Sequence, residues 1–291
     1  EWAEEDDARE TAVGQAIGEF ERRLKYSGQL YPFELSSDKQ LLSYKPEKAL
    51  SRVYEFCLAL SITRQSLTAN PGCQAVREFE RLVGRLLKSL LHPSASKPSD
   101  DCAEWYRSGA PSDGDRPTRM SAMLLELNAK TNEWQFSPAE GIEAQPEEGD
   151  DGIDVVVWKW FGASDNRIGK PFLIAQCACG DDNYWFSKRH ELNPTGFQKK
   201  WGGTISFAGL LRCLATPRHI PHAGVWREGT SDGGILLDRI RLNWLAETSL
   251  HTDEQTEWSG RLGIQIERLN KAPEPNINSA KRRVGRRRTR R

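Results

Sequence analysis

Several features are absent from this 291-residue sequence, and each absence excludes a class of protein. No apolar run approaches the ~20 residues that a membrane-spanning helix needs. The N-terminal stretch Glu1 to Glu10 is acidic and contains no apolar segment, so the sequence predicts no secretory signal. A glycine-rich phosphate loop of the form G-x-x-x-x-G-K-S/T is also missing, which argues against an ATPase. We therefore expect a cytoplasmic protein with no membrane segment.

The six cysteines do not have the spacing of a disulfide framework, so we expect reduced thiols. Cys177 and Cys179 form a C-x-C pair, which raises the alternative of a zinc site. Only His190 lies near them in the sequence, and no second metal-binding pair follows. On a strand, residues two apart share a face, where buried thiols are common. The zinc alternative therefore ranks last.

The zero net charge conceals a strong asymmetry between the body and the end of the chain. Residues 281–291 contain eight Lys and Arg and no acid, so residues 1–280 carry a net charge of −8. A basic tail on an acidic body suits a polyanion such as DNA or RNA, bound through its phosphates. A solubilising end with no binding role explains the same composition equally well.

The N-terminal third is predicted to be helical. Apolar residues at helical spacing predict helices over 5–24, 47–68 and 74–91. Residues 93–150 have a loop-like composition, with one further helix expected over 119–132.

The second half has the composition of a sheet with connecting helices. The β-branched and aromatic segments 153–161 and 171–179 are predicted strands, and a helix is expected over 184–192. Residues 204–214 suit a third strand, with a helix as the alternative; a helix over 235–247 and one short element before 270 complete the prediction. The fold class is therefore α/β. We expect a helical region over 1–70, the α/β domain over 71–255 with an insertion at about 93–150, and a C-terminal segment over 256–291.

Two polar side chains are expected to meet where the first two strands pair. Asp154 lies near the start of one strand and Gln176 near the end of the next, so antiparallel pairing brings them to one sheet edge. The backbone carbonyl of Cys177 lies between them. Such hard oxygen ligands suit Mg²⁺ or Mn²⁺, which would assist hydrolysis of a phosphodiester. The alternative is a structural hydrogen bond between Asp154 and Gln176.

These segments resemble a nuclease family. The run DGIDVV at 151–156 followed by AQCA at 175–178 resembles the PD-(D/E)XK nucleases, in the Mrr-like variant that has Gln in place of the second acid. The segment REFERLV at 77–83 resembles the first core helix of that family. The resemblance implies a restriction-endonuclease-like core over about residues 72–250, a mixed sheet flanked by helices. It also implies that Glu80 is a further metal or water ligand, although a solvated helix glutamate explains that residue as well.

The sequence departs from the family pattern at one important position. The lysine expected two residues after the Gln is Ala178 here. That lysine normally stabilises negative charge on the phosphate. We predict that Lys188, on the following helical segment, replaces it. Lys159 is a weaker candidate because alternation along its strand places it opposite Asp154.

The resulting hypothesis is a metal-dependent DNA endonuclease of bacterial restriction or anti-phage defence. Asp154, Glu80 and the Cys177 carbonyl would hold the ion, Gln176 would complete the set, and Lys188 would stabilise charge. The expected partner is DNA, double-stranded by preference, and an ATPase or helicase subunit is a further candidate; an oligomer is compatible with the sequence. The alternative is a non-catalytic nucleic-acid-binding or scaffold subunit on a decayed nuclease fold.

Other conspicuous side chains are assigned structural roles. Three tryptophans in the predicted sheet and helix are expected to fill the core rather than stack on bases: Trp158, Trp160 and Trp185. His219 and His222 flank Pro221 with no acid at useful spacing, and are given no role.

Overall fold

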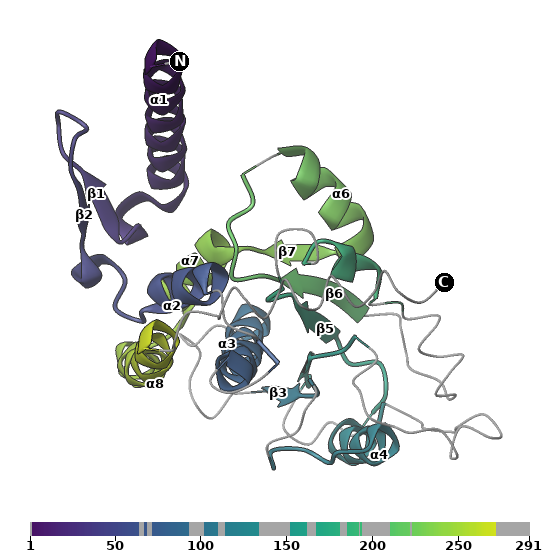
Figure 1. Cartoon of the computed structure of the whole chain (residues 1–291). Helices are drawn as coiled ribbons and strands as arrows, with labels where there is room; N and C mark the ends of the chain where they lie inside the picture. The colour runs from purple at the N-terminus through teal and green to yellow at the C-terminus, as the bar shows by residue number, and fades with distance from the viewer. Residues whose placement is uncertain are drawn as a thin grey trace, which may run out of the picture.

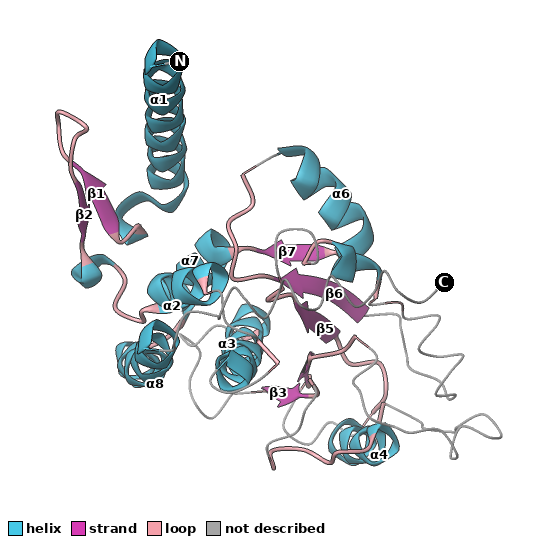
Figure 2. Cartoon of the chain, in the orientation of Figure 1, coloured by secondary structure: helices cyan, strands magenta, loops and turns pink. Residues whose placement is uncertain are grey.

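A computed structural model shows a mixed α/β protein in which helices flank a five-stranded sheet (Figures 1 and 2). The structure describes residues 2–63, 67–68, 72–92, 102–109, 114–133, 152–161, 167–180, 185–191, 193, 210–221 and 223–271. None of the helices in these segments is long and apolar enough to cross a membrane.

The sheet has the order β3-β4-β5-β6-β7, and its strands change direction once. The strands are β3 (Ala103–Arg107), β4 (Val155–Lys159), β5 (Phe172–Cys177), β6 (Leu210–Ala215) and β7 (Ile235–Leu237). The first three pair antiparallel, whereas β5, β6 and β7 run parallel. Val155 is opposite Ala175, so the start of β4 lies beside the end of β5. This is the antiparallel pairing that the sequence predicted.

Helices cover both faces of the sheet. The first face carries α2 (Val53–Ile62), α3 (Gly72–Leu91), α7 (Arg239–Ser249) and α8 (Thr252–Lys271). The apolar stripe of α3 packs against alternate residues of β4 and β5, including Val155, Val157 and Leu173. The other face carries α4 (Met120–Thr131) and, towards β7, α6 (Ala223–Gly233). The central strands β4 and β5 are therefore buried on both sides, as their apolar sequences require.

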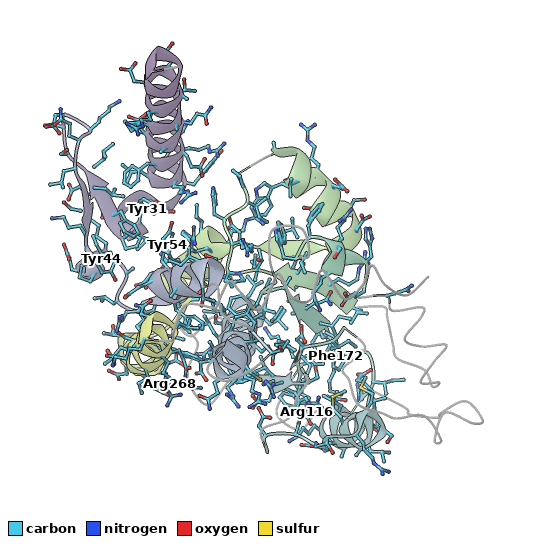
Figure 3. All side chains as sticks on the ribbon, in the orientation of Figure 1. Tyr31, Tyr44, Tyr54, Arg116, Phe172 and Arg268 are labelled. Carbon is cyan, nitrogen blue, oxygen red and sulfur yellow. The ribbon has the colours of Figure 1, made fainter. Side chains whose placement is uncertain are left out.

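The N-terminal region consists of a long helix followed by a small hairpin (Figure 1). Helix α1 (Trp2–Ser27) leads through a 3₁₀ turn (Gly28–Leu30) to β1 (Phe33–Leu35) and β2 (Leu42–Tyr44), which pair antiparallel; a second 3₁₀ turn (Pro46–Lys48) follows. Tyr31 lies between this region and α2: its ring centroid is 5.3 Å from that of Tyr54 and 5.2 Å from that of Phe20 (Figure 3). Aromatic packing therefore attaches the N-terminal region to α2.

The structure confirms several predicted elements. Helices are present at 5–24, 74–91 and 119–132, and strands at 153–161 and 171–179, with small differences at their ends. The third strand is confirmed over Leu210–Ala215, whereas 204–209 lie outside the described residues. The tryptophans assigned to the core do pack there: Trp158, Trp160 and Trp185.

Other predictions are wrong in detail. Of the expected helix over 47–68, the described residues 49–52 are not helical and α2 covers Val53–Ile62; a β-hairpin, which was not expected, lies between α1 and α2. The loop-like segment 93–150 contains strand β3, which forms the edge of the sheet. The described part of the expected helix over 184–192 is a 3₁₀ turn, Ser187–His190. The predicted helix over 235–247 begins as strand β7 and becomes helical only after Asp238, and the short element expected before residue 270 is the 20-residue helix α8.

Candidate active site at the end of strand β5

Asp154 is held firmly where β3, β4 and β5 meet. Its backbone N–H donates to the carbonyl of Ala175 (3.0 Å), and its own carbonyl accepts from the N–H groups of Ser108 (2.8 Å) and Gly109 (2.9 Å). The side-chain Oδ2 accepts a hydrogen bond from the backbone N–H of Cys177 (2.6 Å). The carboxylate therefore lies at the end of β5, as predicted, and it is buried.

Glu80 approaches the same point from helix α3. Its buried carboxylate accepts a hydrogen bond from the Arg107 Nε at 2.6 Å, and both side chains are only 3% exposed. A side chain at Gly109 would come within 2.5 Å of Glu80 Oε2, so the carboxylate packs directly against that glycine. Gly109 also donates to the Asp154 carbonyl, so this one residue contacts both acidic residues.

The pKa values of two buried thiols are raised by both carboxylates. Burial raises the pKa of the Cys177 thiol well above its usual value, and the negative charges of Asp154 and then Glu80 raise it further. Burial likewise raises the pKa of Cys179, with contributions from Glu80 and then Asp154, whereas the Lys188 ammonium acts in the opposite direction. Asp154, Glu80 and Lys188 therefore all lie within electrostatic range of Cys179.

Gln176 is fully buried beside a different acid. Its Nε2 donates to Glu191 Oε2 at 2.7 Å, and the same oxygen accepts from the Lys188 ammonium at 3.1 Å. The amide oxygen of Gln176 is buried and has no hydrogen-bond partner among the described residues. An unpaired buried carbonyl oxygen is costly, so this atom is a candidate ligand for a bound group.

The structure brings the predicted residues to one end of the sheet but does not pair them as expected. Asp154 binds the backbone of Cys177 rather than the amide of Gln176, which binds Glu191. Cys177 packs on the α3 side of the sheet, so alternation directs Gln176 to the opposite side. Glu80 and Gln176 thus approach the Asp154 end of the sheet from its two faces.

The two candidate lysines have different surroundings. Lys188 belongs to the 3₁₀ turn that follows β5, and its side chain is 24% exposed and ion-paired with Glu191. Lys159 donates to the carbonyl of Leu91 at the end of α3, far along β4 from Asp154. Of these two, only Lys188 lies near the carboxyl end of β5.

Sequence reasoning missed Arg107 and Glu191. Arg107 is the last residue of β3, a strand within the segment that was expected to be loop-like. The two aromatic residues of its short sequence AEWYR were the only sign of a strand there. Glu191 stands three residues after Lys188, a spacing typical of ordinary surface ion pairs. Its contact with Gln176 depends on how the chain turns after β5, and no local pattern predicted it.

The oxygen atoms at this edge fit a hard divalent ion in their chemistry. The set comprises the carboxylates of Asp154 and Glu80, the carbonyl of Cys177 and the unpaired amide oxygen of Gln176, all types that Mg²⁺ accepts. Within the described part of the chain, no group of three or more His, Cys, Asp or Glu side chains is arranged to hold a metal ion. Any ion here would therefore depend on the amide, the backbone carbonyl and water as well as on the two acids.

The surroundings of Cys177, Cys179 and His190 bear on the zinc alternative. Cys177 and Cys179 are buried in the core on the α3 side, whereas His190 is 60% exposed and lies 3.8 Å from Asp232. The thiols and the imidazole therefore have separate surroundings.

Comparisons with known proteins add one distant likeness. The sequence matches no protein-family profile, and it is not significantly similar to any curated protein. Among solved structures, the MspJI restriction endonuclease in complex with a 27-mer oligonucleotide is similar with a TM-score of 0.34 and 13% sequence identity. The alignment covers 82% of this chain, which spans 40% of the length of that enzyme. A TM-score this low does not establish a shared fold.

Proposed function

We propose that this protein is a metal-dependent nuclease that hydrolyses phosphodiester bonds in DNA, on a restriction-endonuclease-like core. The observation that carries the proposal is the position of Asp154, whose carboxylate lies at the end of β5 and accepts from the Cys177 backbone N–H. Gly109, which packs against Glu80, donates to the Asp154 carbonyl, and the amide oxygen of Gln176, one residue before Cys177, is buried and unpaired. A mixed sheet flanked by helices supports the same proposal.

Each residue has a distinct part in this proposal. Asp154, Glu80 and the Cys177 carbonyl would hold Mg²⁺ or Mn²⁺, and the amide oxygen of Gln176 would complete the set. The ion, when bound, would polarise the phosphoryl oxygen and lower the pKa of the attacking water. Lys188 would stabilise the negative charge that develops on the phosphate, and Glu191 would position both Lys188 and Gln176 through its shared oxygen.

Arg107 would act as a positioning residue. Its guanidinium bonds Glu80 and, through Nη1, Asp115 at 2.9 Å. This contact balances the charge of the buried Glu80 carboxylate and fixes its direction. Arg107 is itself buried, so contact with substrate is not expected.

Plasmid cleavage tests the proposal. The wild-type chain is incubated with supercoiled DNA in Mg²⁺, in Mn²⁺ and in EDTA, beside Asp154→Asn and the control Asp253→Asn, which changes an exposed acid on α8. We expect cutting by wild type and control only with metal, and at least a 100-fold loss for Asp154→Asn, on the order of removing one transition-state contact. Equal cutting by wild type and Asp154→Asn would overturn the assigned site.

A second candidate function is a nucleic-acid-binding subunit without catalysis. Ala178 replaces the family lysine, and the charges of Glu80 and Lys188 are both balanced by protein partners, Arg107 and Glu191. This alternative predicts DNA binding that is unchanged in Asp154→Asn and no cutting with either metal. A role in restriction or anti-phage defence, a cytoplasmic location and an ATPase or helicase partner are parts of the nuclease proposal.

A further inference from the structure

A pocket of about 800 Å³ lies against β7, the strand at the opposite edge of the sheet from β3. Its walls come from the end of α1, the loop after β6, the start of α6 and the face of α7. Because β5, β6 and β7 are parallel, the loops after β6 and β7 emerge on the side where β5 ends.

The floor of this pocket is built rigidly. Asp238 caps helix α7 by accepting from the Arg241 N–H at 3.0 Å, and it also accepts from the Ile220 N–H at 3.3 Å. His219 Nδ1 lies 3.0 Å from the same carboxylate, and its Nε2 lies 2.6 Å from Glu19 of α1. His219, which was given no role because no acid lies at useful spacing in the sequence, thus contacts two acids from distant segments. These contacts join α1, the loop after β6 and α7 around the pocket.

Aromatic rings form its walls. Trp226 of α6 is fixed by a hydrogen bond from its Nε1 to the carbonyl of Ile220 (2.9 Å). Trp244 of α7 and Tyr26 of α1 line the same pocket. Trp244 nevertheless remains 51% exposed and Tyr26 68% exposed. Large aromatic surfaces left open beside a cavity are suited to stacking on a planar ligand.

Two arginines supply positive charge next to these rings. The guanidinium of Arg241 lies 4.3 Å from the centre of the Trp226 ring, and its Nη1 donates to the carbonyl of Leu236 (2.9 Å). Its other guanidinium nitrogens have no hydrogen-bond partner among the described residues. Arg22, on the α1 side, pairs with Glu19 through one nitrogen. Both side chains line the pocket and retain donors for an anion.

We infer that this pocket binds a nucleobase together with its phosphate. A planar aromatic ring would stack on Trp244, and the phosphate would accept from Arg22 and Arg241. The volume lies within the range of about 300–1,000 Å³ that small-molecule sites occupy. The ligand is either a free nucleotide or an unpaired nucleotide of a nucleic-acid strand, which share this chemistry. The inference goes beyond the proposed nuclease and does not require it.

Calorimetric titration of the full-length chain tests the pocket without catalysis. The ligands are the four deoxynucleoside 5′-monophosphates, deoxyadenosine and N-acetyltryptophan, in EDTA so that no metal contributes. We expect saturable binding of at least one nucleotide below about 1 mM. Deoxyadenosine should bind several-fold more weakly than dAMP if the arginines hold the phosphate. No binding of any nucleotide up to about 5 mM would overturn the inference, as would equal binding of N-acetyltryptophan and the best nucleotide.

Variants assign the binding to these residues. Trp244→Ala should weaken nucleotide binding about tenfold or more, whereas Trp244→Phe, which retains a ring, should recover most of the affinity. Phe161→Ala removes a side chain that is 79% exposed outside the pocket and should change nothing. Arg22→Gln should reduce the affinity for dAMP and leave that for deoxyadenosine unchanged. Unchanged dAMP binding by Trp244→Ala and Arg22→Gln would place the nucleotide elsewhere.

Two further experiments are needed. One distinguishes a free nucleotide from a nucleotide within a strand, and the other distinguishes the pocket from the proposed nuclease site. A short single-stranded oligonucleotide should compete with dAMP if the pocket takes an unpaired nucleotide of a strand, and the competition should disappear when that nucleotide is made abasic. Competition by neither oligonucleotide assigns the pocket to free nucleotides. Asp154→Asn should bind dAMP as wild type does, so a failure of plasmid cleavage leaves this result standing, and the reverse holds as well.

Discussion

At the scale of single residues, Asp154 combines a structural contact with its proposed chemical role. Its Oδ2 accepts the N–H of Cys177 where the ladder between β4 and β5 ends. Without the carboxylate, the buried N–H group of Cys177 would lose this hydrogen bond. Asp154 therefore lies where the pairing of β4 and β5 ends, and its own carboxylate is held at the end of β5.

Replacement of Asp154 should accordingly affect stability as well as activity. We expect Asp154→Ala to lower the free energy of unfolding by about 1–3 kcal/mol, because a buried donor loses its acceptor. Asp154→Asn should lose less, because its amide oxygen can still accept the bond. Urea unfolding at pH 7 measures both. If Asp154→Ala is as stable as wild type, the hydrogen bond to Cys177 does not form in solution.

The buried thiols give the fold a defined sensitivity to alkali. Burial raises the pKa of the Cys57 thiol from 9.0 to about 12. Below pH 9 the thiol is protonated in both the folded and the unfolded chain. Above pH 9 the unfolded chain releases the proton while the folded chain retains it, so the unfolded state binds fewer protons and stability falls as pH rises towards 12.

We therefore expect the unfolding free energy to decrease steadily between pH 9 and pH 11. Cys177 and Cys179 act in the same direction, because burial raises the pKa of each. Denaturant unfolding at several pH values measures the slope. Cys57→Ala should have a shallower slope, whereas Cys73→Ala, at a partly exposed position, serves as the control. Identical slopes in wild type and Cys57→Ala would show that the Cys57 thiol ionises equally in both states.

At the scale of elements, the connection between α6 and β7 depends on one glycine. Gly234 has φ +79°, and a side chain there would collide with the backbone carbonyl of Arg212 on β6. The position needs both the left-handed conformation and the close approach of β6, which only glycine allows. β7 could not pair with β6 in its observed register without it.

A matched pair of glycine substitutions tests this requirement. Gly234→Ala should destabilise the protein by about 2 kcal/mol or more, from backbone strain and the clash with β6. Gly224→Ala, in α6, meets no atom within 4 Å and should be neutral or stabilise by up to about 1 kcal/mol. Thermal unfolding of both variants measures the contrast. Equal midpoints for the two would contradict the proposed conformation of Gly234.

The elements that were predictable have strong local patterns. The stripe of α3 and the unbroken apolar runs of β4 and β5 predicted both the type and the position of each element. β7 was read as helix because three apolar residues have no periodicity of their own, and it becomes a strand only by pairing with β6. The Asp238 cap, which accepts from the N–H of Arg241, marked the true start of α7 in the sequence.

At the scale of the whole molecule, the candidate site depends on contacts between distant segments. Helix α3 supplies Glu80, β3 supplies Arg107, and the turn after β5 supplies Glu191. The sequence predicted the acids at 80 and 154 through their resemblance to a nuclease family. It could not predict that Glu80 is balanced by a buried arginine or that Gln176 binds Glu191, because both contacts arise only when the sheet is assembled.

Charge distribution over the whole chain decides how DNA would be held. Residues 1–280 carry a net charge of −8 and residues 281–291 carry eight cations. An acidic body repels a duplex, so long-range attraction must come from local arginines or from the tail. Residues 272–291 lie outside the described part of the chain.

Salt dependence distinguishes these two sources. DNA affinity is measured in EDTA at several NaCl concentrations for the full chain, a chain ending at residue 280, and a full-length variant with the eight tail cations changed to Gln. Each phosphate contact contributes about 0.9 to the slope of log K against log salt. If the tail is the contact, both variants should bind more weakly with a slope reduced by several units, at most about 7. If both variants retain the slope, the contacts lie on the body instead. An acidic body can hold DNA only through clustered local charge, so Arg22 and Arg241 are then the first arginines to change.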